Sequence, residues 1–102
     1  MEINKDSVDE IIKESIEEMN TQLEEGKRLK TDDENDVIFG PDSPLDSLDF
    51  VNLMVIIEDT LFDKTGRDLT IVSDRAFSKK YNPFKNIERL SQYILELLKE
   101  ED

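Results

Sequence analysis

Apolar residues recur at helical spacing in the first part of the chain. From Ser7 to about Glu25 they are separated by steps of four, four, three and four. This spacing places one apolar stripe along a helix, formed by Val8, Ile12, Ile16, Met19 and Leu23, with Ile11 beside it. Ser7 followed by Glu10 has the spacing of a capping box, and Gly26 follows the last periodic residues. The pattern therefore predicts an amphipathic helix that begins at Ser7 and stops at Gly26.

A second helix is predicted from Ser47 to about Asp63, and it is more apolar than one buried side requires. With each residue turned about 100° from the last, the core sector contains Phe50, Leu53, Met54, Ile57 and Leu61. Further apolar residues lie outside this sector, namely Leu48, Val51, Val55, Ile56 and Phe62. Val51 and Val55 either pack under neighbouring segments or face a partner, and we expect Phe62 to pack. Gly66 ends the pattern.

The remaining segments complete an all-α pattern. A last helix is predicted from about Lys85 to Lys99, with one face formed by Ile87, Leu90, Ile94, Leu97 and Leu98 and with Tyr93 adjacent. Ser73–Phe77 is predicted to form one short helical turn capped by Ser73, and only residues 69–72 are candidates for an extended segment. The chain of 102 residues fits a single domain, 1–102. We predict a small four-helix bundle with three longer helices, one short helix and a long loop between the first two.

That first connection, residues 26–46, is unusually long. It contains an acidic run at residues 31–36 and a turn-rich run at residues 40–44, with Val37, Ile38 and Phe39 between them. We expect these three apolar residues to pin the loop to the core. The acidic residues do not match an EF-hand, because neither Asp32 nor Asp33 as a start gives glycine at the sixth position and glutamate at the twelfth. No metal site is predicted, and a loop of this length is usually functional.

The net charge of the chain indicates which kind of partner it can bind. The chain has 26 acidic and 13 basic residues, a formal net charge of −13, and no His or Cys. It therefore lacks disulfides, cysteine or imidazole metal ligands, and catalytic pairs that contain His or Cys. A strongly acidic surface repels nucleic acid and anionic lipid, so a basic protein surface is the expected partner. The polar N-terminus and the short apolar run Leu53–Ile57 provide no signal peptide and no membrane span, and we expect a cytoplasmic monomer.

One serine lies where the long loop meets the second helix. Ser47 stands between Asp46 and Leu48, and Asp49 follows. The first N–H groups of a helix are unsatisfied and carry partial positive charge, so a phosphate ester on Ser47 would be well placed. The acidic neighbours are poor for an oxyanion-type active site. They suit a hydroxyl that is presented to a cationic or metal-bearing modifying enzyme.

The triplet Asp46-Ser47-Leu48, within the segment Leu45–Val51, resembles the acyl carrier protein family. The similarity extends to Leu53, the Glu58–Asp59 pair, Phe62, Ile87 and Tyr93–Ile94. It implies that Ser47 receives 4′-phosphopantetheine from coenzyme A through a phosphodiester, attached by a separate phosphopantetheinyl transferase. The thiol of this arm would carry acyl groups as thioesters, and the chain itself would not be an enzyme. It would deliver them to acyltransferases, ketosynthases and related enzymes of fatty-acid, polyketide or other lipid biosynthesis with basic docking surfaces.

The resemblance also implies roles for residues of the second helix. Partner recognition would involve Asp46, Leu48, Asp49, Val51, Val55, Ile56, Glu58 and Asp59. An acyl-chain cavity would be lined by Phe50, Met54, Ile57 and Leu61. Asn52 stands where the family usually has glutamate, and the additional loop residues favour a specialised carrier. Asp49 favours fatty-acid and polyketide carriers over peptidyl carriers.

Other interpretations of the same residues remain. Ser47 is alternatively a helix N-cap, or the first helical residue with Asp46 as the cap, in an acidic helical interaction module without a prosthetic group. In that case Ser47→Ala loses about 1 kcal/mol of stability and no activity. Ser43 is a rival serine, but Pro44 follows it and no helix begins there. An enzyme would have to use carboxylates such as Asp46 with Asp49, or the adjacent lysines 79 and 80, and no base–nucleophile pairing supports this.

Overall fold

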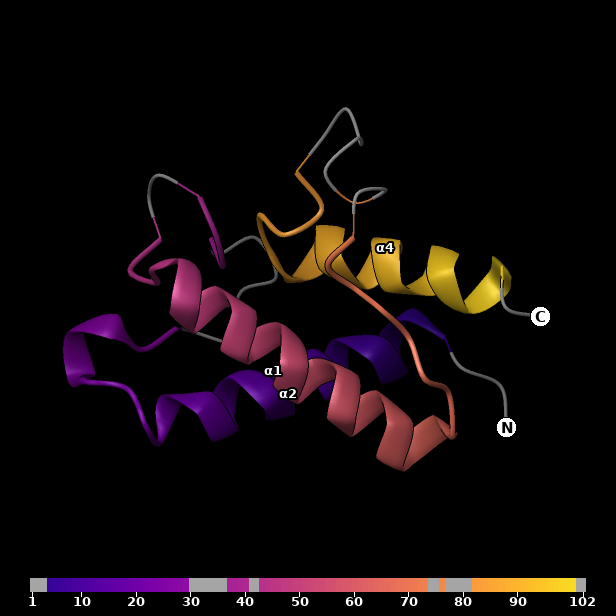
Figure 1. The fold of residues 1–102 in the computed structure, drawn as a ribbon, viewed down its shortest axis with the longest axis horizontal. Helices are drawn as coiled ribbons and strands as arrows, with labels where there is room; N and C mark the ends of the chain where they lie inside the picture. The colour runs from indigo at the N-terminus through magenta and orange to yellow at the C-terminus, as the bar shows by residue number, and fades with distance from the viewer. Residues whose placement is uncertain (1–3, 30–36, 41–42, 74–75, 77–81, 101–102) are drawn as a thin grey trace.

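In a computed structural model, the described part of the chain contains three α-helices and one short 3-10 helix (Figure 1). The structure describes all residues except 1–3, 30–36, 41–42, 74–75, 77–81 and 101–102. The helices are α1 (Lys5–Asn20), η1 (Glu25–Lys27), α2 (Ser47–Thr65) and α4 (Ile87–Glu100). The described residues contain no strand and only one isolated antiparallel bridge, between Val37 and Asn86. The all-α class is confirmed, whereas the short helix predicted at Ser73–Phe77 lies mostly outside the described residues.

The limits of α1 differ from the sequence prediction at both ends. Asn4 is the N-cap, because its side-chain oxygen accepts the backbone N–H of Ser7 at 2.9 Å. The helix ends at Asn20, whose side-chain amide donates to the carbonyl of Leu29 at 2.8 Å and accepts its N–H at 2.9 Å. The prediction of Gly26 as the stop is wrong, since Gly26 lies inside η1. The end of the helix therefore coincides with hydrogen bonds between Asn20 and Leu29, which are nine residues apart in sequence. A local sequence pattern does not reveal such a contact.

The predicted core face of α2 is confirmed. Phe50, Leu53, Met54, Ile57 and Leu61 are all buried. The helix starts at Ser47 as predicted, with Asp46 as its cap, and ends at Thr65. Gly66 is its C-cap, with a φ of 72° in the left-handed region. A residue with a Cβ is strained at that φ, which explains a glycine at the end of the helix.

Packing places α1 against both other long helices, while aromatic side chains join α2 to α4. Phe50 of α2 meets Phe84 edge-on with ring centroids 5.0 Å apart, and Phe84 meets Tyr93 of α4 at 6.2 Å. The connecting segment after α2 contributes buried Leu69 and Ile71. On α4 the expected buried residues are confirmed except for Leu97, which is only half-buried.

Two polar contacts cross between helices in the interior. The buried carboxylate of Asp9 on α1 accepts a hydrogen bond from the hydroxyl of Ser91 on α4, and Lys5 Nζ lies 3.0 Å from the same carboxylate group. Ser15 of α1 lies opposite Thr60 of α2, with their hydroxyl oxygens 3.5 Å apart. Burying Asp9 next to a cation and a hydroxyl avoids an unpaired buried charge.

The long connection before α2 is anchored to the core where the apolar residues predicted it. Ile38 is 2% exposed and donates its N–H to the carbonyl of Lys85 at 2.6 Å. Phe39 stacks on Phe50 with ring centroids 4.2 Å apart. Leu45, just before α2, is also buried. The chain therefore enters α2 from a fixed point, while the acidic run, residues 31–36, lies outside the described residues.

No helix in the described part of the chain combines the length and apolar character required to cross a bilayer.

Candidate functional site

The N-terminus of α2 has a capping box, in which the side chains of Asp46 and Asp49 each lie against the backbone nitrogen of the other residue. Asp46 Oδ1 accepts the backbone N–H of Asp49 at 2.8 Å, and Asp49 Oδ2 lies 3.5 Å from the backbone nitrogen of Asp46. The N–H of Phe50 donates to the Asp46 carbonyl at 3.0 Å and begins the helical ladder. Carboxylates at this end also interact favourably with the helix dipole. Asp46 is thus the cap, which confirms the prediction of Ser47 as the first helical residue after an Asp46 cap, whereas the alternative in which Ser47 itself caps the helix is wrong.

Ser47 is the first residue of the helix and is exposed. Among the described residues, its hydroxyl and the backbone N–H groups of Ser47 and Leu48 have no hydrogen-bond partner. A hydroxyl at this place can be replaced by an ester without breaking an internal contact. The two N–H groups point to the helix end where a phosphate oxygen is best stabilised. The geometry therefore fits a phosphodiester on Ser47.

The apolar residues predicted for partner recognition are exposed. The exposed fractions are 69% for Leu48, 47% for Val51 and 48% for Val55, so these side chains do not pack under other segments. Ile56 is half-buried, and Asp59 is exposed. Large exposed apolar side chains that gather on one helix face are typical of interaction surfaces.

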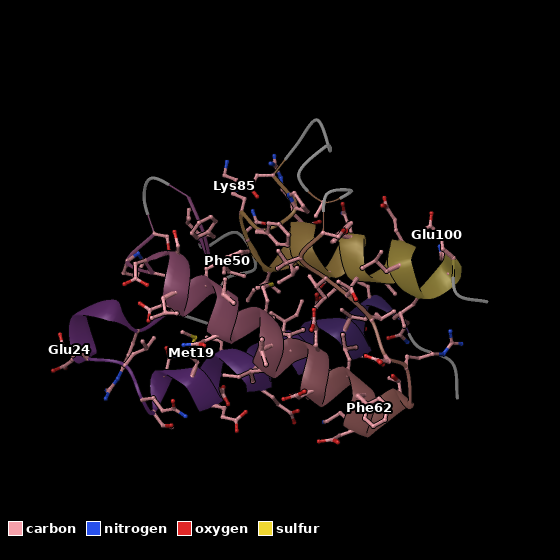
Figure 2. The ribbon with its side chains drawn as sticks, viewed as in Figure 1. Met19, Glu24, Phe50, Phe62, Lys85 and Glu100 are labelled. Carbon is pink, nitrogen blue, oxygen red and sulfur yellow. The ribbon has the colours of Figure 1, made fainter. Side chains whose placement is uncertain are left out.

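Phe62 was expected to pack, and this prediction is wrong. Its side chain is 54% exposed, and Figure 2 shows it towards the C-terminal end of α2, far along the helix from Phe50. The reason is the path of the segment after Gly66, which returns on another side of the helix. There the N–H of Ile71 donates to Glu58 Oε2 at 2.8 Å.

That contact gives Glu58 an internal role that the sequence did not indicate. Its carboxylate fixes the returning segment, and the residue is half-buried. Glu58 therefore differs from Asp46 and Asp59, which are exposed. Its negative charge still lies beside the exposed face of α2.

The residues expected to line an acyl cavity all lie in the packed core. Phe50 is 4% exposed, Met54 1%, and Ile57 and Leu61 0%. The described residues form a pocket of about 410 Å³ in another place, between α2 and the C-terminal end of α1. It is lined by Met19, Gln22, Leu23, Asp49, Asn52, Val55 and Ile56.

Sequence reasoning missed this pocket because it extended the first helix to Glu25. In the structure α1 ends at Asn20, and Gln22 and Leu23, which follow it, line the pocket beside α2 (Figure 2 labels Met19 near this end of α1). On α2 the lining residues Asp49, Asn52 and Ile56 are three and four residues apart and therefore lie on one side of the helix. This spacing is the only feature of the sequence that could have indicated the pocket.

Comparisons with protein-family models, with curated proteins and with solved structures found no match to this chain.

Proposed function

We propose that the protein is an acyl carrier that holds its cargo on a 4′-phosphopantetheine arm attached to Ser47. The observation that carries the proposal is the exposed Ser47 hydroxyl at the first position of α2, next to a cap made by Asp46 and Asp49. Because the cap does not use Ser47, esterification leaves the helix start intact. The triplet resemblance to acyl carrier proteins supports the same assignment.

The attachment is a balanced transfer in which Ser47 supplies the nucleophile. Its oxygen forms a bond to the phosphorus that bears the pantetheine arm in coenzyme A, the bond within the pyrophosphate breaks, and adenosine 3′,5′-bisphosphate leaves. In this proposal the hydroxyl proton passes to a base of the transferase. When bound, the arm supplies a thiol for thioesters, which a chain without cysteine lacks.

The residues around Ser47 then serve recognition rather than catalysis. Asp46 and Asp49 present negative charge at the attachment point, and Leu48, Val51 and Val55 add exposed apolar contacts. The partners in this proposal are a phosphopantetheinyl transferase and acyl-transferring or condensing enzymes with basic docking surfaces. Tethering raises the effective concentration of the acyl group at each of these enzymes.

For the cargo, we propose that the acyl chain enters between the helices beside Phe50, Met54, Ile57 and Leu61. These side chains are buried and packed, so a long chain requires them to repack. A protein loaded with a long acyl chain should therefore differ from the unloaded protein in the methyl NMR signals of Met54 and Ile57. Unchanged signals of Met54 and Ile57 would show that the acyl chain does not enter the core beside them.

The experiment that tests the proposal is intact mass spectrometry after incubation with coenzyme A and a permissive phosphopantetheinyl transferase. We expect the protein to gain the mass of one phosphopantetheinyl group and Ser47→Ala to gain none. Ser43→Ala is the matched control and should react like the wild type, because Ser43 uses its hydroxyl inside the loop, bonded to the carbonyl of Ile38. Modification of Ser47→Ala, or no modification of the folded wild type, contradicts the proposal.

A second candidate function is an acidic helical interaction module without a prosthetic group. The exposed apolar face of α2 favours it independently of Ser47. The sequence-based form of this hypothesis predicted a stability loss of about 1 kcal/mol for Ser47→Ala. With Asp46 as the cap, that variant should instead keep its stability. Complementation of the gene deletion by Ser47→Ala would support the module, and failure to complement by this stable variant would support the carrier.

A further inference from the structure

The pocket between α2 and the segment that follows α1 is not used by the attachment chemistry at Ser47. Its volume of about 410 Å³ lies within the range of about 300–1,000 Å³ found for small-molecule sites. Its lining combines four apolar side chains with two carboxamides, Gln22 and Asn52, and one carboxylate, Asp49. Such a lining suits an elongated molecule in which amide groups alternate with short hydrocarbon segments.

The pocket lies within reach of a substituent on Ser47. Asn52 and Ile56 lie about 8 Å and about 14 Å further along α2 than Ser47, at about 1.5 Å per residue. A 4′-phosphopantetheine arm has about fourteen bonds from the serine oxygen to the sulfur and extends about 16 Å, at about 3.5 Å for every three bonds. Around the helix, at about 100° per residue, the exposed side chains of Leu48 and Val51 occupy the sector between Ser47 and the pocket. An arm on Ser47 can therefore cross an exposed apolar surface and bring its thiol end to the pocket.

The groups that line the pocket match the parts of this arm. The carboxamides of Gln22 and Asn52 can both donate and accept hydrogen bonds, which is what an amide ligand requires. Leu23 and Ile56 are half-buried and present apolar surface to methylene and methyl groups. The carboxylate of Asp49 disfavours a second negative charge beside it, so a thiol held in the pocket stays protonated and reacts slowly.

We propose that this pocket is the resting site of the 4′-phosphopantetheine arm when its thiol is free or carries a short acyl group. The inference rests on the proposed attachment to Ser47 and adds where the arm lies between encounters with enzymes. This site is outside the packed core, so it requires no movement of Phe50 or Met54. A long acyl chain exceeds the pocket and still requires the core to repack. At the resting site the thiol is shielded from reagents in solution, because its reactivity depends on exposure of the thiolate.

The first test measures the rate at which iodoacetamide alkylates the thiol of the loaded protein, after mass spectrometry has confirmed loading. Gln22→Trp fills the pocket from the segment after α1 and leaves the sequence of α2 unchanged. Glu24→Trp is the matched control, because Glu24 is exposed, does not line the pocket and makes no capping hydrogen bond. Figure 2 labels Glu24 at the edge of the molecule, away from Met19. If the pocket holds the arm for about 80% of the time, the wild type and Glu24→Trp should react about fivefold more slowly than Gln22→Trp, because only the released fraction reacts.

The second test locates the arm by NMR spectra of the loaded and unloaded protein. We expect loading to shift the methyl signals of Leu23 and Ile56 and the side-chain amide signals of Asn52. The same loading should leave the Leu23 and Ile56 signals of Gln22→Trp unchanged, because the indole occupies the pocket. Circular dichroism checks that both tryptophan variants are folded.

Two results overturn the inference and leave the carrier function standing. One is an equal alkylation rate for the loaded wild type and the loaded, folded Gln22→Trp. The other is a set of loading shifts that does not include Leu23 and Ile56. Both results are obtained on protein whose mass already shows the arm, so they concern only where the arm rests. Failure of the folded wild type to gain the arm would instead contradict the carrier function and the resting site together.

Discussion

Asp46→Ala should destabilise the protein, whereas Ser47→Ala, one residue later, should leave its stability almost unchanged. Asp46→Ala removes the acceptor of the Asp49 N–H, a hydrogen bond of 2.8 Å, and one carboxylate from the positive end of the helix. A lost N-cap costs about 1 kcal/mol, and a lost charge at a helix end costs about 0.3–1 kcal/mol. Relief of repulsion between two nearby carboxylates offsets a few tenths of this, so we expect a loss of about 1–1.5 kcal/mol.

Ser47→Ala removes a hydroxyl for which the described residues provide no partner. Alanine is also the better helix former, so the free energy of unfolding should change by less than about 0.5 kcal/mol. For a domain of this size, 1 kcal/mol corresponds to a shift of about 4–8 °C in melting temperature. Urea and thermal denaturation followed by circular dichroism measure both variants, and Asp46→Asn, which keeps a capping oxygen, is the matched control. A loss above about 1 kcal/mol for Ser47→Ala with none for Asp46→Ala would refute the assignment of the cap.

The remaining predictions concern packing, backbone geometry and binding. Ser91→Ala should cost about 1–3 kcal/mol in urea denaturation, since the buried Asp9 carboxylate loses a hydroxyl donor; an unchanged midpoint would mean that water replaces it. Gly66→Ala should cost about 1 kcal/mol because of its φ of 72°, and no atom lies near enough to add a clash. Phe39→Ala should cost about 1–2 kcal/mol by removing the stack on Phe50, with faster proteolysis of the loop before α2 as the accompanying measurement. Association with the transferase should slow as salt rises, and a rate independent of ionic strength in stopped-flow measurements would contradict an electrostatic contribution of α2.

The helices were predictable from sequence because burial repeats with the helical period. The five core residues of α2 illustrate this, since a single sector of the helix contains them all. Gly66 was also predictable, because glycine after a periodic run is the usual end of a helix. Ile38 and Phe39 were identified as loop anchors because apolar residues stand out between polar runs.

The wrong predictions, for the two ends of α1 and for Phe62, have physical causes that a local sequence pattern does not contain. Asn4 and Ser7 are both good caps three residues apart, and their competition was settled by the bond from the Ser7 N–H to Asn4. The end of α1 coincides with hydrogen bonds between Asn20 and Leu29, and the residues around this end, Met19, Gln22 and Leu23, line the pocket beside α2. The exposure of Phe62 follows from the path of a later segment, which the bond to Glu58 fixes.

The candidate site was predictable as a position, while its geometry was not. Ser47 was selected by its place between the long loop and the second helix, together with the triplet resemblance. Which residue caps α2 could not be decided from sequence, since Asp46 and Ser47 are both suitable caps. The structure assigns the cap to Asp46 and leaves the serine hydroxyl exposed, which is the arrangement an attachment site requires.

The most direct test of the central claim is the mass of the Ser47 peptide from the protein purified out of the cells that make it. Proteolysis followed by tandem mass spectrometry should find this peptide with an added phosphopantetheinyl group, free or acylated at its thiol. The peptide that contains Ser43 but not Ser47 should be unmodified. A Ser47 peptide recovered only in unmodified form, or an arm located on another serine, would contradict the carrier function.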